Sequence, residues 1–214
     1  MKYSVKMATH SYGKWKVPED FRAGEEVLIA FSRKNGHAYL IAGKYEVHGH
    51  FIFKKTFSRG FCELSCEPLL YIRFKNITGE DLILIENYIE SHEGVRESSC
   101  INYCLITLFN SLGIRINSQK KNIVNLEDCL LNILHSGASR NEREQEVEVY
   151  KTLPWSILQI VNHFNLLEKR FSLTHICSRF LGKILFYLRP EHRAYYREVN
   201  YIDTSYLVRR LGER

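Results

Sequence analysis

The sequence predicts an α+β fold, because strand-length apolar runs dominate its first third and amphipathic helical patterns follow them. Three apolar runs separated by short turns occupy residues 26–54, which is typical of an antiparallel meander. Two helices with clear capping signals follow, at 78–91 and 100–112. The composition agrees with a folded domain, since 45% of the 214 residues are hydrophobic and 25% are charged.

The strands of the meander are delimited by turn residues. An Asn-Gly pair follows the first run and favours a tight hairpin turn, and Gly43-Lys44 separates the second run from the third. A further apolar run, PLLYIRF, predicts a fourth strand in the same sheet. The four predicted strands are residues 26–32, 37–43, 45–54 and 68–74.

Alternation with a period of two assigns the strand side chains to faces. It groups His37 with Tyr39 on the second strand, and Glu46, His48 and His50 on the third. Because hairpin pairing brings these strands side by side, we expect the imidazoles of His37 and His48 to be neighbours.

The helix at 100–112 presents a cysteine in its first turn. Ser98 or Ser99 can accept a hydrogen bond from the N–H groups of that turn, and Gly113 suits the left-handed residue that ends a helix. The helix dipole favours negative charge at the N-terminus and so favours the thiolate of Cys100. The sequence therefore offers a candidate nucleophile, although a small buried residue at a helix end is the simpler interpretation.

Helical patterns dominate the rest of the chain. Thr78 and Asp81 form a predicted capping box at the start of the helix before Cys100. We expect residues 1–26 to be an irregular segment and residues 136–147 to be a charged loop. The remaining predicted helices are residues 123–135, 153–167 and 173–188.

Charge and cysteine content restrict the cellular setting. Six cysteines without an N-terminal secretory signal indicate reduced thiols, and so a cytoplasmic protein or one delivered to a host cytosol by a signal-less route. The net charge of +6 is spread among acids, which disfavours nucleic-acid binding. The tyrosine- and arginine-rich C-terminal helices could instead lie on a membrane surface.

A cysteine nucleophile needs a base within hydrogen-bond reach and a third group that orients the base. His37 follows a turn at the start of a strand and is the candidate base for Cys100. His48 is the candidate orienting group, His50 could take the same role, and Glu46 is a weaker third candidate.

Two other arrangements of the cysteines deserve comparison. Cys104 lies one turn further into the helix, where burial raises a thiol pKa and the dipole helps less, so we favour Cys100. Cys62 and Cys66 repeat the spacing of Cys100 and Cys104, and four thiolates could hold a structural zinc. Zinc sites more often use two intervening residues in a tight loop, so we expect no metal and no cofactor.

The segments HAYLIAGKYEVH, TGEDLILIENYIES and SSCINYCLITLFNSLG together resemble a known family. Over about residues 25–116 the chain is similar to the circularly permuted branch of the NlpC/P60 papain-like superfamily, which includes lecithin:retinol acyltransferase and its phospholipid-acyltransferase relatives. The likeness lies in a His strand, a glycine turn, a second His strand and a later helix that carries Cys. The sequence departs from the family at Ser99, where an Asn is common.

The resemblance implies a permuted papain-like fold, with an antiparallel sheet packed on the Cys-bearing helix. It implies that Cys100 is the nucleophile, His37 the base and His48 the orienting group of a thiol hydrolase or acyltransferase. The substrate would be an amide or ester of a lipid, a peptide or a protein side chain, attacked to form a thioester. We expect residues 1–117 to form the catalytic domain and residues 118–214 a helical extension. The alternative is a catalytically inactive papain-like fold that serves as a protein- or membrane-binding adaptor.

Overall fold

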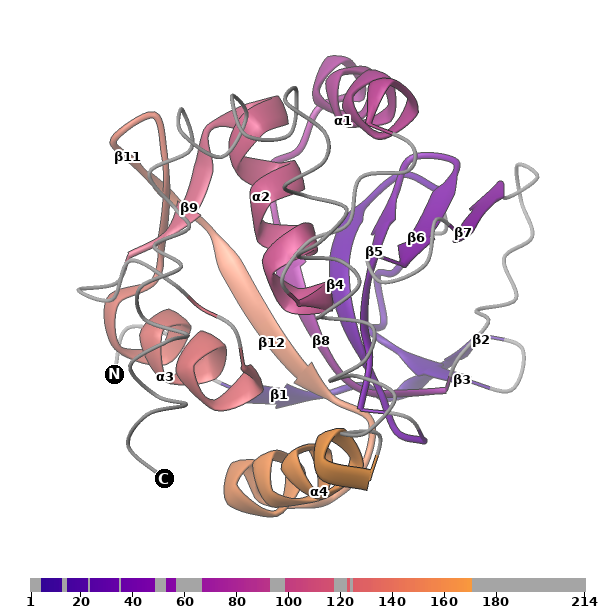
Figure 1. Ribbon diagram of the computed structural model, residues 1–214, viewed down its shortest axis with the longest axis vertical. Helices are drawn as coiled ribbons and strands as arrows, with labels where there is room; N and C mark the ends of the chain where they lie inside the picture. Colours follow the sequence, from indigo (N-terminus) through magenta and orange to yellow (C-terminus); the bar gives the residue numbers. More distant parts are fainter. Residues whose placement is uncertain are drawn as a thin grey trace, which may run out of the picture.

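The computed structural model describes residues 5–12, 15–22, 24–34, 36–48, 53–56, 67–92, 99–117, 123 and 125–170, with the side chains of 53–56 and 168–170 excepted. Within these residues the protein is an α+β fold with helices packed on a mixed sheet (Figure 1). The predicted α+β class is therefore confirmed. The predicted helix at 173–188 and the C-terminal tail lie outside the described residues.

The central sheet contains seven strands. They are β1 (Val5–Met7), β4 (Val27–Ser32), β5 (Ala38–Ala42), β6 (Tyr45–His48), β7 (Phe53–Thr56), β8 (Pro68–Phe74) and β12 (Val147–Lys151). Their order across the sheet is β1-β12-β8-β4-β5-β6-β7. The meander β4-β5-β6-β7 is antiparallel, as predicted, but β1 pairs with β12 in parallel. The expectation of a purely antiparallel sheet is thus wrong at this edge, where an N-terminal segment lies beside a strand far along the chain.

Two small sheets accompany the central one. One is the hairpin of β2 (His10–Tyr12) and β3 (Trp15–Val17). The other contains β9 (Ile114–Ile116), β10 (Ala138–Arg140) and β11 (Arg143–Gln145). The predicted irregular segment at 1–26 and the predicted loop at 136–147 therefore both contain strands. Three-residue strands carry too little alternation to be recognised, and their pairing depends on partners distant in sequence.

The helices are α1 (Gly79–Ser91), α2 (Cys100–Leu112), α3 (Leu126–Ser136) and α4 (Ile157–Arg170). The α1 capping box is present as predicted, because Thr78 and Asp81 exchange side-chain and backbone hydrogen bonds. In Figure 1, α2 crosses one face of the sheet in front of β8 and β4, and α1 lies next to α2. Every helix in the described part of the chain is too short or too polar to cross a lipid bilayer.

Each face of the sheet is buried in a hydrophobic core. The larger core joins the helices to one set of alternating strand residues, such as Leu40 of β5 and Ile72 of β8. The smaller core contains Tyr39, Tyr71 and the β2–β3 side of the molecule, including Val17. Since both faces are covered, every residue of β4, β5 and β8 is buried.

The larger core extends across the division predicted at residue 117. Val147 and Val149 of β12 belong to it, as do Ile133 of α3 and Phe164 of α4. β12 is also hydrogen-bonded directly to β8 within the central sheet. Residues 125–170 were expected to belong to a separate extension. They share one sheet and one core with the expected catalytic domain, so the described part of the chain does not divide at residue 117.

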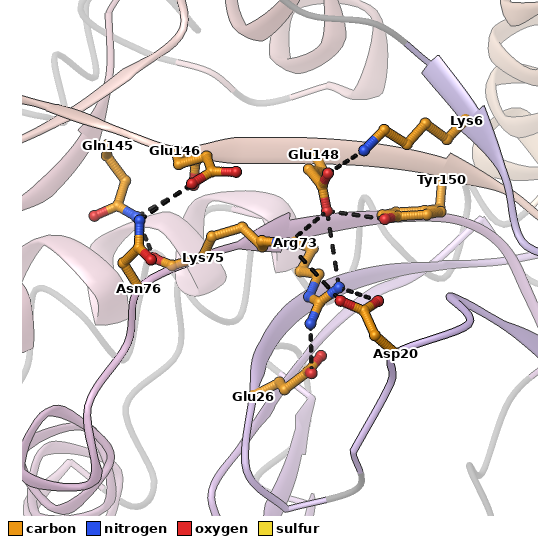
Figure 2. A network of polar contacts seen from close by, with 10 residues as sticks. All are labelled: Lys6, Asp20, Glu26, Arg73, Lys75, Asn76, Gln145, Glu146, Glu148 and Tyr150. Atoms are coloured by element: carbon orange, nitrogen blue, oxygen red, sulfur yellow. Dashed lines mark hydrogen bonds and ion pairs between the residues drawn. The ribbon is translucent and has the colours of Figure 1, made fainter.

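A network of charged side chains connects strands β1, β12 and β8 with Asp20 and Glu26 (Figure 2). The Arg73 guanidinium on β8 donates to Asp20 at 2.5 Å and to Glu26 at 2.6 Å. Glu148 on β12 accepts from Tyr150 at 2.8 Å and also bonds Lys6 on β1. The hydrogen bond from Arg73 is the main reason that the pKa of Asp20 lies below its ordinary value. The N-terminal segment is thereby joined electrostatically to β8 and β12.

Candidate functional site

The candidate nucleophile occupies the first residue of α2. Ser99 is the N-cap, and its hydroxyl accepts a hydrogen bond from the Asn102 N–H at 3.1 Å. Gly113 ends the helix in the left-handed conformation with φ of 69°, as predicted. The first turn, from Cys100 to Tyr103, contains no acidic residue that would oppose a thiolate. The local sequence thus places a thiol at the positive end of a well-capped helix.

The candidate base and its neighbour come from the β5–β6 hairpin. Tyr39 of β5 lies directly opposite His48 of β6 in the antiparallel register. The turn between the strands requires Gly43, whose φ is +53°, a conformation that glycine adopts without strain. This register brings His37, one residue before β5, next to His48, which confirms the predicted proximity of the two imidazoles.

A continuous series of contacts joins the helix to this hairpin. The backbone N–H of Ala38 donates to the Sγ atom of Cys100 at 3.2 Å. His37 Nε2 lies 2.8 Å from His48 Nδ1, and His48 Nε2 lies 2.8 Å from Glu46 Oε1. The thiol therefore contacts the backbone immediately after His37, and His37 is the first of three hydrogen-bonded side chains that end in a carboxylate.

The two imidazole rings meet edge to edge. Their planes differ by only 9° and their centroids are 5.0 Å apart, which fits an in-plane hydrogen bond rather than face-to-face stacking. In this geometry the Nε2 atom of His37 is hydrogen-bonded to Nδ1 of His48. The other ring nitrogen of His37, Nδ1, is then the atom through which the imidazole would exchange a proton with a thiol.

The site is largely withdrawn from solvent. Cys100 is 3% exposed, the Glu46 side chain is fully buried and the His48 side chain is 11% exposed, and His37 is partly buried like His48. Hydrogen bonds and ion pairs are stronger in such surroundings than in water. The fully buried carboxylate therefore lies behind two partly buried imidazoles.

Both ends of the β5–β6 hairpin are held by other elements. At the β5–β6 turn, Glu86 of α1 accepts a hydrogen bond from the Lys44 N–H at 2.8 Å. At the opposite end, Arg33 pairs with Glu67 at 2.8 Å, and His163 of α4 donates to the Arg33 carbonyl at 2.9 Å. The helix α4, assigned to the extension in the sequence analysis, thus supports the turn that precedes His37.

The competing thiol, Cys104, lies deeper in the protein. It is completely buried, and burial is the main cause that raises its pKa, with the neighbouring thiols of Cys100 and Cys129 adding to the effect. Burial likewise raises the pKa of Cys129. Cys104 is the fifth residue of α2 and Cys129 the fourth of α3, whereas Cys100 is the first residue of its helix.

The structure thus brings together three residues that the sequence selected, Cys100, His37 and His48. The sequence pattern predicts Glu46 only as an alternative to His48. In the structure Glu46 instead contacts the Nε2 atom of His48, the ring nitrogen that does not bond His37. The signal was the Glu-x-His spacing, which puts both side chains on one face of β6.

The remaining candidates are not placed by the structure. His50, Cys62 and Cys66 lie outside the described residues, so neither the alternative orienting histidine nor the zinc arrangement is located. Across the described ranges, no group of His, Cys, Asp and Glu side chains has a geometry that could hold a metal ion. Comparison with protein-family models, with curated proteins and with solved structures finds no match to this chain.

Proposed function

We propose that this protein is a cysteine-dependent hydrolase or acyltransferase that acts on an amide or ester carbonyl through a thioester on Cys100. The observation that carries the proposal is the contact series in which the Cys100 thiol meets the backbone after His37, and His37 bonds His48. A thiol at a helix N-terminus, a neighbouring imidazole and a group that orients it are the parts that nucleophilic cysteine catalysis requires.

The same arrangement supports a papain-like fold of the circularly permuted NlpC/P60 kind. The His-bearing hairpin precedes the Cys-bearing helix in the chain, and α2 packs against β5 in the larger core. This order agrees with the resemblance of residues 25–116 to that superfamily. The α+β class and the chain order are the structural support for this part of the proposal.

The proposed reaction has two halves. His37 takes the thiol proton, and the Cys100 sulfur attacks the carbonyl carbon, while the backbone N–H of Cys100 stabilises the developing oxyanion. Collapse of the tetrahedral intermediate breaks the C–N or C–O bond, and His37 returns the proton to the departing amine or alcohol. Water or a second acceptor then gives its proton to His37 and attacks the thioester, which restores the Cys100 thiol.

Alkylation by iodoacetamide between pH 5 and 9, with the modified residue identified by mass spectrometry, tests the activation of Cys100. We expect Cys100 to react with a midpoint well below about 8.5, the ordinary value for a cysteine. His37→Ala should remove this reactivity at neutral pH, because the imidazole no longer accepts the proton. His135→Ala is a matched control, since His135 is exposed on α3 and belongs to no contact of the site.

Incubation with activated esters then tests acyl transfer, because a thioester intermediate adds the acyl mass to Cys100. Slow alkylation of Cys100, unchanged in His37→Ala, would contradict the proposal. The protein would then be better interpreted as a non-catalytic adaptor with this fold.

A further inference from the structure

We infer that Glu46 is a positioning residue that fixes the protons on both imidazoles and so leaves Nδ1 of His37 unprotonated, as the base for the thiol of Cys100. This inference rests on the proposed function, but it concerns a group that never touches the substrate. The contacts run from Glu46 to His48 and from His48 to His37.

The carboxylate of Glu46 determines the first proton position. A carboxyl group is ordinarily a stronger acid than an imidazolium, so the proton between Glu46 Oε1 and His48 Nε2 belongs to the imidazole nitrogen. A neutral imidazole carries only one N–H. The Nδ1 atom of His48 is therefore the unprotonated nitrogen and must accept a hydrogen bond.

The second proton position follows from the first. His48 Nδ1 accepts from His37 at 2.8 Å, so His37 must carry its proton on Nε2. Its Nδ1 atom then holds a lone pair that can accept the thiol proton of Cys100. Reversing the first hydrogen bond would reverse the second, and Nδ1 of His37 would then carry an N–H instead of a lone pair.

The charge of Glu46 has a second consequence. When His37 takes the thiol proton, positive charge appears on the imidazole pair, next to a fully buried carboxylate. An opposite charge in buried surroundings stabilises that imidazolium and therefore the thiolate with which it is paired. Glu46 thus sets the direction of the hydrogen bonds and also favours the ion pair.

The tautomers can be observed directly by nitrogen NMR of the full chain labelled with ¹⁵N-histidine, with the signals of His37 and His48 identified from His37→Ala and His48→Gln spectra. We expect both residues to carry the proton on Nε2 while neutral. A neutral His48 protonated on Nδ1 would overturn the inference. This measurement needs no catalytic activity, so it decides the inference even if Cys100 proves unreactive and the proposed function fails.

Glu46→Gln tests the consequence for reactivity. The variant loses the charge and can turn its amide N–H toward His48, so we expect the alkylation midpoint of Cys100 to rise. The rate at pH 7 should fall about 10- to 100-fold, the effect that loss of the outer hydrogen-bond partner has on a metal-ligating histidine. Glu46→Asp keeps the charge with a shorter reach and should give an intermediate profile.

Glu86→Gln is the matched control, because Glu86 also bonds the β5–β6 hairpin but at the Lys44 turn, away from the imidazoles. Its alkylation profile should equal that of the wild type. An unchanged midpoint and rate in folded Glu46→Gln would overturn the inference. If Glu46→Gln does not fold, the wild-type tautomers decide the question alone.

Discussion

Removal of the α2 N-cap by Ser99→Ala should destabilise the protein measurably. The Ser99 hydroxyl satisfies the Asn102 N–H at 3.1 Å, and both residues are buried, with Ser99 4% exposed. Loss of an N-cap costs about 0.5–2 kcal/mol, and a buried donor left without its acceptor belongs at the upper end of that range. We therefore expect the free energy of unfolding to fall by about 1–2 kcal/mol.

Ser156→Ala provides a matched comparison at the start of α4. The Ser156 hydroxyl accepts from the Gln159 N–H at 3.2 Å, but this cap is exposed, so water can replace the lost oxygen. Its removal should cost about 0.5 kcal/mol, at the lower end of the range. The difference between the two variants isolates the effect of burial at the candidate site.

Urea unfolding, followed by circular dichroism, measures the loss of unfolding free energy in each variant. The comparison holds if the slope of the unfolding free energy against urea concentration is the same as in the wild type. Ser99→Ala should also slow the alkylation of Cys100, though less than His37→Ala does, because the dipole of α2 remains. A loss of stability in Ser99→Ala no greater than that in Ser156→Ala would refute the reasoning that a buried cap holds the Cys100 turn.

Two further predictions concern ionisation elsewhere in the protein. Hydrogen bonds from Arg140 are the main cause that lowers the pKa of Asp81 from its ordinary value of 3.8. The ionised carboxylate therefore stabilises the fold at pH values above 3.8, and this contribution is lost as the pH falls below 3.8 and the carboxylate is protonated. Asp81→Asn should therefore cost about 1–2 kcal/mol at pH 7 in urea unfolding, and the difference from wild type should narrow below about pH 4; a difference that is constant with pH would contradict this. Because burial raises the pKa of Cys104 and Cys129, both should resist iodoacetamide at pH 7 in the folded protein and react after denaturation. Modification of Cys104 as fast as that of Cys100, measured by mass spectrometry, would count against the assignment of the nucleophile.

Local patterns were sufficient to predict the elements that carry the site. The strand PLLYIRF, the capping box at Thr78 and the left-handed Gly113 are all observed as predicted, because each depends on residues within a few positions of one another. The predicted proximity of His37 and His48 likewise follows from alternation across a two-residue turn. These features require little information from the rest of the chain.

Elements that depend on distant partners were not predicted. β1 is three residues long and pairs with β12, more than a hundred residues later, and β10 pairs with β9 across α3. Local patterns therefore predict an irregular segment at residues 1–26 and a loop at residues 136–147. The change of pattern after residue 117 likewise predicts a division there, although β12 lies in the central sheet between β1 and β8.

The amino-acid sequence by itself determined which residues could take part in the chemistry: a cysteine at a capped helix start and two histidines at hairpin spacing. Only the tertiary structure decided that the Ala38 N–H reaches the Cys100 sulfur and that Glu46 stands behind His48. Periodicity assigns a side chain to a face, but it does not fix the packing of a helix against a sheet or the direction of a hydrogen bond. Those depend on the burial of the whole core, in which α2, β5 and β12 each contribute to the same hydrophobic cluster.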